Sequence, residues 1–204
     1  MGDEPAAWAS IGFSVADDGA CPVGTVPLHL AGPGAGRGVT GWTLADGGGD
    51  IDGVPTAAAD LGSAGNTVDL RSLPERPPDH PNGVLSIDHL VAMTPDLDRT
   101  TAALEERGIA LRRTREAGRG REQRFFRLGE VILELIGPVA PQGDGPAKLW
   151  GLAFTVADLD ATAGHLEGRI GATKDAVQAG RRIATLHAGD EISVPVAFMS
   201  QAHR

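Results

Sequence analysis

Short apolar runs, separated by polar and turn-forming residues, predict the elements of the second half of the chain. Residues 85–93 and 149–156 are apolar, too short for a core helix and bounded by turn residues, which indicates strands. After each run a helix is predicted, and in the first Leu97 and Leu104 share one face. Further strands are predicted at 112–116, 123–128 and 130–136 in the first unit, and at 172–177, 181–186 and 192–199 in the second. The pattern is β-α-β-β-β, twice.

The two units share sequence as well as pattern. When residues 89–107 are shifted forward by 62 they fall on residues 151–169, and eight of the nineteen positions are then identical. The identical pairs are Leu90 and Leu152, Asp96 and Asp158, Leu97 and Leu159, Asp98 and Asp160, Thr100 and Thr162, Leu104 and Leu166, Glu105 and Glu167, and Arg107 and Arg169. One supersecondary unit is therefore used twice.

The first helix carries capping chemistry at both ends. Thr94 is expected to cap it, and Pro95 suits the first helical position, where its missing N–H costs no hydrogen bond. Asp96 and Asp98 would then lie at the positive end of the helix dipole. Gly108 should end the helix.

The amino-terminal region differs in composition from the repeat. The chain has 29 glycines and 14 prolines, which concentrate in the first 83 residues and predict many turns. A short helical stretch at 6–12 and strands at 13–15, 23–30 and 38–44 indicate a β-rich segment that resembles a module without its opening strand.

These patterns divide the chain into three regions of an α+β protein. Residues 1–56 form the β-rich amino-terminal segment, and residues 57–83 form a Pro- and Gly-rich linker that cannot hold a regular element. Residues 84–204 contain the tandem βαβββ modules, at 84–138 and 148–200, which should form one cup-shaped sheet.

Charge and composition argue against several classes of function. The formal charge of -9 disfavours a nucleic-acid partner, because phosphate contacts need a concentrated basic surface. No apolar stretch approaches the roughly 20 residues that a membrane crossing requires. Cys21, the single cysteine, cannot form an intramolecular disulfide, and residues 1–5 lack the features of a secretory signal. We therefore expect a cytoplasmic protein.

Two motifs point to a family. Ile87-Asp88-His89-Leu90-Val91, followed by Thr94-Pro95-Asp96-Leu97-Asp98, resembles the opening strand and helix of modules in the vicinal oxygen chelate superfamily of glyoxalases, bleomycin-resistance proteins and extradiol dioxygenases. Val131-Ile132-Leu133-Glu134-Leu135 is similar to the closing strand. The resemblance covers somewhat over half of the chain. It implies metal ligands at the first-strand histidine and last-strand carboxylate, here His89 and Glu134.

His89 and Glu134 are suitable ligands for Zn²⁺, Mn²⁺, Fe²⁺ or Ni²⁺. Strand alternation puts His89 on one face with Val91 and Met93, and it gives Glu134 apolar neighbours as well. A glutamate in so apolar a strand needs a partner, because burying a lone carboxylate is costly. A lone histidine in a strand, however, is often an ordinary core or surface residue.

The second module lacks both ligands, since Gly151 stands at the position of His89 and Ala197 at that of Glu134. Catalytic metal sites usually keep about three protein ligands, so one chain offers too few. The cup then either binds a small organic molecule without metal, or shares a divalent ion between His89 and Glu134 of two chains in a homodimer. The second case would be a metal-dependent lyase, isomerase or dioxygenase. A structural or interaction protein with a filled cup is a third possibility.

Two arginines complete the predicted site, although no catalytic residue stands out. Arg124 and Arg182 occupy equivalent strand positions and could bind a ligand carboxylate or phosphate, or pair with Glu134. The other arginines between 112 and 127 more often form a solvated hairpin. The predicted ligand-binding residues are His89, Val91, Met93, Arg124, Glu134 and Arg182.

Overall fold

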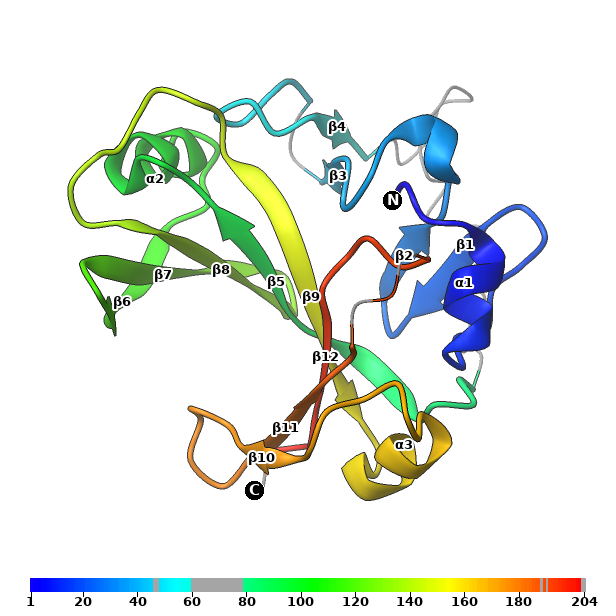
Figure 1. The fold of residues 1–204 in the computed structure, drawn as a ribbon. Helices are drawn as coiled ribbons and strands as arrows, with labels where there is room; N and C mark the ends of the chain where they lie inside the picture. The colour runs from blue at the N-terminus through cyan, green and yellow to red at the C-terminus, as the bar shows by residue number, and fades with distance from the viewer. Residues whose placement is uncertain (46–47, 60–78, 188, 190, 203–204) are drawn as a thin grey trace. The chain divides into compact units, whose positions relative to one another are not determined.

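The computed structural model describes residues 1–45, 48–59, 79–187, 189 and 191–202 and confirms an α+β protein. Its helices are α1 (Pro5–Ser10), the short 3-10 helix η1 (Pro33–Ala35), α2 (Leu97–Glu105) and α3 (Leu159–His165). Its strands are β1 (Ala20–Val23), β2 (Val26–His29), β3 (Trp42–Leu44), β4 (Thr56–Ala58), β5 (Val84–Met93), β6 (Leu111–Gly118), β7 (Arg121–Leu128), β8 (Val131–Pro138), β9 (Lys148–Val156), β10 (Lys174–Asp175), β11 (Arg182–Thr185) and β12 (Val196–Met199) (Figure 1). None of the described helices is long and apolar enough to cross a membrane.

The described residues fall into two compact units. Unit 1 contains residues 1–38, 79–88 and 151–202, and unit 2 contains residues 39–59 and 89–150. Each unit therefore combines most of one module with part of the amino-terminal region, while residues 84–88 of the first module fall in unit 1 and residues 148–150 of the second fall in unit 2. The predicted domain boundaries at 57 and 83 remain predictions, and most of the predicted linker lies outside the described residues.

Unit 2 contains the succession of elements predicted for the first module. The second half of β5 pairs in parallel with β8, and β8, β7 and β6 continue as antiparallel neighbours. Helix α2 packs against β8 on one face of this sheet (Figure 1). Beneath it lie the buried side chains of Leu90, Phe126, Leu133 and Leu135. Buried and partly exposed residues alternate along β8, as expected of a strand with one face against α2.

Unit 1 repeats that order with shorter strands. β9 pairs in parallel with β12, and β12, β11 and β10 follow as antiparallel neighbours. Helix α3 packs against β11 and β12. β10 contains only Lys174 and Asp175, so the predicted strand at 172–177 is present but short. The β-α-β-β-β pattern is thus confirmed in both modules.

The pairing register reproduces the internal alignment of the two modules. Glu134 pairs with Val91 in the first module, and Ala197 pairs with Ala153 in the second. Since Ala153 is 62 residues after Val91, Ala197 occupies the place of Glu134, as the repeat predicted.

The helix starts differ from the prediction. α2 begins at Leu97, and Asp96 is its N-cap, with a side-chain oxygen that accepts from the Arg99 N–H at 3.0 Å. Thr94 and Pro95 lie outside the helix, so both predicted roles were wrong. A carboxylate at the N-cap both satisfies a free N–H and places negative charge on the helix dipole, which favours Asp96 over Thr94. Beyond the helix, Gly108 has a φ of +75°, as expected of a helix-ending glycine.

The repeated threonines attach each helix to the amino-terminal region. The Thr100 hydroxyl bonds to the Asp52 carboxylate in unit 2. In unit 1 the Thr162 hydroxyl donates to the Asn82 carbonyl at 2.7 Å. Both hydroxyls are also within hydrogen-bond distance of the carbonyl four residues earlier in their own helix. Thr100 and Thr162 therefore each join their helix to a segment that precedes the two modules.

The repeated arginines have the same kind of role. Arg107 donates to the Gly48 carbonyl at 2.9 Å, and Arg169 donates to the Ser10 carbonyl at 3.0 Å. Both carbonyls belong to the amino-terminal region. This region thus covers the helix of each module with a different piece of chain, and an identical residue in each module binds it.

The amino-terminal segment is β-rich, but its strands are shorter than predicted. A turn at Gly24 divides the predicted strand 23–30 into the hairpin of β1 and β2. The predicted strand at 13–15 was wrong, because Phe13 instead packs its ring against Trp8 and Phe154, at centroid distances of 4.9 and 5.0 Å. Aromatic burial here outweighs strand pairing.

His80 makes the stability of unit 1 depend on pH. Its Nδ1 accepts from the Ser14 N–H at 3.0 Å, so Nε2 carries the proton that it donates to the Pro22 carbonyl, also at 3.0 Å. Burial lowers the pKa of His80, because the charged imidazole loses its water. Protonation would also break the bond from Ser14.

We therefore expect the free energy of unfolding to fall as the pH drops below about 6.5, because the unfolded chain then binds a proton that the folded chain resists. Urea titrations at about pH 7.5 and about pH 5.5 measure the effect. His80→Gln, which cannot titrate, should flatten the difference between the two pH values. An equal pH dependence in both proteins would contradict the assignment.

Candidate functional site

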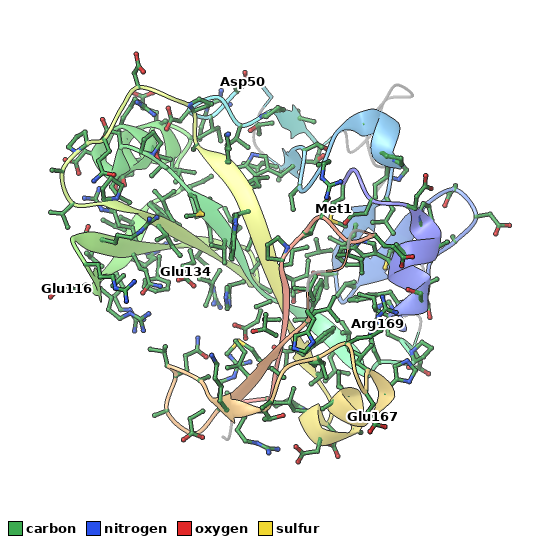
Figure 2. All side chains as sticks on the ribbon, viewed as in Figure 1. Met1, Asp50, Glu116, Glu134, Glu167 and Arg169 are labelled. Atoms are coloured by element: carbon green, nitrogen blue, oxygen red, sulfur yellow. The ribbon has the colours of Figure 1, made fainter. Side chains whose placement is uncertain are left out.

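The open side of the unit 2 sheet carries the predicted histidine and glutamate. The pairing register places the following residues on this side, which we call the His89 face: His89, Val91 and Met93 of β5, Ile132, Glu134 and Ile136 of β8, Gln123, Phe125 and Arg127 of β7, and Arg113 and Arg115 of β6. Figure 2 shows Glu134 on the side of the sheet that faces away from α2.

Four side chains form a continuous polar row across the His89 face. The Arg115 Nε donates to Gln123 Oε1 at 2.8 Å, and the Gln123 amide donates to Glu134. The other Glu134 oxygen lies 3.6 Å from His89 Nε2. The side chains of His89 and Glu134 are 17% and 13% exposed, so the pair is accessible but mostly shielded from water.

This row fixes the orientation of the Gln123 amide. Arg115 has only donors, so it holds the Gln123 oxygen and turns the NH₂ group towards Glu134. Glu134 therefore has a hydrogen-bond donor and a neighbouring imidazole within the same unit. The partner that the sequence required for this carboxylate is Gln123 together with His89.

Apolar side chains surround the polar row. Val91 is buried, and Met93, Ile132 and Ile136 are partly exposed on the same face. The Phe125 ring is also partly exposed. An apolar surface with a few convergent polar groups is the usual composition of a small-molecule site.

The structure does not bring Arg124 to this site. Arg124 lies on the opposite face of β7, where it pairs with Asp98 at 2.7 Å and Glu122 at 2.8 Å. It also donates to the Thr101 hydroxyl and the Leu97 carbonyl of α2. The prediction that Arg124 binds ligand or pairs with Glu134 here is replaced by a role in holding α2 on the sheet.

Arg182 has the equivalent role in unit 1. Its guanidinium binds both oxygens of Asp160 in α3, at 3.0 and 2.8 Å, and this hydrogen bonding lowers the pKa of the Asp160 carboxyl. Arg182 also lines a pocket of about 590 Å³, together with Asp175 and Ser200. It is thus not a partner of Glu134, because alternation along β11 turns it towards α3.

The second module cannot restore the missing metal ligand. A Cβ on Gly151 would lie 2.9 Å from the Pro195 carbonyl oxygen, so the close approach of β9 to the chain before β12 requires glycine. Ala197 has no donor atom. Neither position of the second module can therefore complete a metal site.

A buried ion pair within unit 1 joins the two modules in sequence. Arg181 Nη1 contacts the Asp88 carboxylate at 2.6 Å, and its other donors reach Gln178, Thr155 and the Ser200 carbonyl. Asp88 thus faces Arg181 and Thr155.

A metal ion fits the His89 face poorly within one chain. Among the described residues, no group of three or more His, Cys, Asp and Glu side chains is placed to hold an ion. His89 and Glu134 supply two ligands, while Arg115 brings positive charge next to Gln123, which bonds to the carboxylate. We therefore derive no metal chemistry from a single chain, and the site shared by two chains remains a prediction.

Gln123, Phe125 and Arg115 were not predicted as site residues. Alternation within 123–128 would have placed Gln123 and Phe125 on one face, but the register against β8 decides which face that is. That register depends on the turn at Gly129 and on the packing of the whole sheet. The internal repeat did not point to Gln123, Phe125 or Arg115 either, because it marks only residues that are identical in both modules.

The strand order makes this chain a protein of paired βαβββ modules. No protein-family model and no curated protein sequence matches it. Similar solved structures include methylmalonyl-CoA epimerase from Mycobacterium tuberculosis, at 20% identity and a TM-score of 0.48, which covers 59% of this chain and 91% of that one.

Methylmalonyl-CoA epimerase from Streptomyces coelicolor, in complex with 2-nitronate-propionyl-CoA, is 22% identical, with a TM-score of 0.47 and coverage of 59% and 99%. A glyoxalase I mutant from Zea mays is 15% identical, with a TM-score of 0.42 and coverage of 60% and 46%. Both kinds of protein belong to the vicinal oxygen chelate superfamily, which the sequence motifs resemble. At these identities and TM-scores the likeness carries no argument about function, which must be argued from the site.

Proposed function

We propose that the His89 face binds a small organic molecule without a metal ion. The observation that supports this proposal most is that Glu134 already has partners within the unit. It accepts a hydrogen bond from the Gln123 amide, and its other oxygen lies 3.6 Å from His89 Nε2. A carboxylate with these partners is stabilised without a cation. It can therefore serve as a polar anchor for a ligand.

The apolar part of the face supports the same function. Met93, Ile132 and Ile136 are partly exposed around the polar row, where an organic ligand would remove them from water. Burial of one such side chain contributes about 1.5–3 kcal/mol at most, so these contacts would supply part of the binding free energy and the polar row would supply the rest. The ligand would then place a hydrogen-bonding group near His89 and Glu134.

The neutral dye N-phenyl-1-naphthylamine tests this proposal, because its fluorescence rises in an apolar site. We expect saturable binding to the native protein and roughly five- to tenfold weaker binding to Ile136→Gln. Ile183→Gln is the matched control, since Ile183 is a partly exposed isoleucine on a strand of unit 1. Absence of saturable binding, or equal weakening in both variants, would contradict the proposal.

A further inference from the structure

Arg113 and Arg115 indicate which class of molecule the His89 face would take. We infer that the ligand carries an oxyanion, such as a carboxylate, sulfonate or phosphate group, bound by these two guanidinium groups. This inference rests on the proposed function and specifies its ligand.

A β-bulge places both arginines on the His89 face. Leu111 pairs with Phe126, but Arg113 pairs with Phe125, so the register shifts by one residue at Arg112. Without this shift, Arg113 and Arg115 would lie on the face covered by α2. With it, Arg115 pairs with Gln123, which belongs to the polar row.

Phe125 positions both guanidinium groups. The Cζ atoms of Arg113 and Arg115 lie 4.6 and 5.9 Å from the centre of its ring. Cation–π contact holds a guanidinium through its flat face and leaves its N–H groups free to point outwards. Arg115 uses Nε and Nη2 on Gln123, so its Nη1 group, together with Arg113, would meet an oxyanion. The ring thus orders two long side chains before any ligand arrives, which lowers the entropic cost of binding.

The partners of these arginines differ from those of the arginines that hold the fold together. Arg99, Arg124, Arg181 and Arg182 each form an ion pair with an aspartate. Arg113 and Arg115 form no ion pair with any carboxylate in the described part of the chain. In a protein with 27 acidic and 18 basic side chains, two guanidinium groups ordered by a ring instead of a carboxylate mark an anion site.

The positions of these arginines relative to the rest of the His89 face indicate where each part of the ligand would bind. Its oxyanion would contact Arg113 and Arg115, and its apolar body would cover Phe125 and Ile132. A hydrogen-bonding group at the other end would reach His89 and Glu134. The predicted class is therefore a small apolar acid with a second polar group.

Two dyes with the same aromatic body test the inference. 8-Anilinonaphthalene-1-sulfonate carries a sulfonate, whereas N-phenyl-1-naphthylamine is its neutral counterpart. We expect the sulfonate to bind the native protein more tightly, and the double variant Arg113→Gln/Arg115→Gln to weaken its binding roughly tenfold or more. Binding of the neutral dye to the single variant Arg113→Gln, which leaves the bond from Arg115 to Gln123 intact, should change by less than about twofold.

Matched variants make the outcomes distinct. Arg119→Gln removes the same charge at the exposed turn of the same hairpin and should leave both dyes unaffected. Arg113→Gln alone keeps the bond from Arg115 to Gln123 and should show part of the effect. Thermal unfolding of each variant verifies that it is folded.

The inference would be overturned if the double variant bound the sulfonate as well as the native protein, or if Arg119→Gln weakened it equally. Failure of the proposed function would look different, because the native protein would then bind neither dye in a manner sensitive to Ile136→Gln.

Discussion

Arg181→Met should lower the free energy of unfolding by about 3–5 kcal/mol, because it removes the cation from a buried ion pair. Arg181 is 7% exposed and contacts Asp88 at 2.6 Å. It also donates to the Ser200 carbonyl at 2.8 Å and to the Thr155 hydroxyl at 3.2 Å. The substitution would therefore remove the donor that Asp88, Thr155 and Ser200 share. Denaturant unfolding followed by circular dichroism measures the change.

The neighbouring residue provides the control. Arg182 and Asp160 are also paired, but their side chains are 46% and 67% exposed, so Arg182→Met should have a much smaller effect. The double variant Asp88→Asn/Arg181→Met should recover part of the loss, since it also removes the charge of Asp88. Equal losses in the two single variants would show that burial does not distinguish these pairs.

Trp8→Ala should destabilise unit 1 by about 3–5 kcal/mol, which is the usual cost of removing a large aromatic side chain from a core. Trp8 is completely buried, with its ring 4.9 Å from Phe13 and 6.1 Å from Phe154. Its indole N–H also donates to Asp3 at 3.1 Å. The loss would therefore combine a cavity with a broken hydrogen bond, and denaturant unfolding measures it.

Trp150→Ala is the matched control for this substitution. Trp150 is 48% exposed, so its removal should cost only a small part of the effect at Trp8. A loss below about 1 kcal/mol at Trp8 would contradict the assignment of α1 to the core of unit 1.

The fold was predictable because the sequence repeats the residues that dock the helices. Asp96 and Asp158 cap α2 and α3, and Asp98 and Asp160 bind the equivalent arginines Arg124 and Arg182. Identity between modules thus marked docking contacts common to both. The equivalence of Arg124 and Arg182 should have indicated a structural role for the same reason.

The site was only partly predictable. His89 and Glu134 could be placed together because alternation and parallel pairing of first and last strands bring them to one face. Arg115 could not be placed on this face from the sequence. The bulge at Arg112 moves it from one face of the sheet to the other, and no residue type indicates that shift. The cap at Asp96 was missed for a local reason, since Thr94 and Asp96 are both good caps and only the backbone decides between them.

The NMR signals of the His89 imidazole test the central claim most directly. They can be assigned with His89→Asn and followed as N-phenyl-1-naphthylamine is added in the presence of a chelator. We predict a saturable shift of these signals with the same affinity that the fluorescence titration gives. Metal-free binding at the His89 face would be contradicted if the His89 chemical shifts did not change on addition of the dye and changed only when Zn²⁺ replaced the chelator.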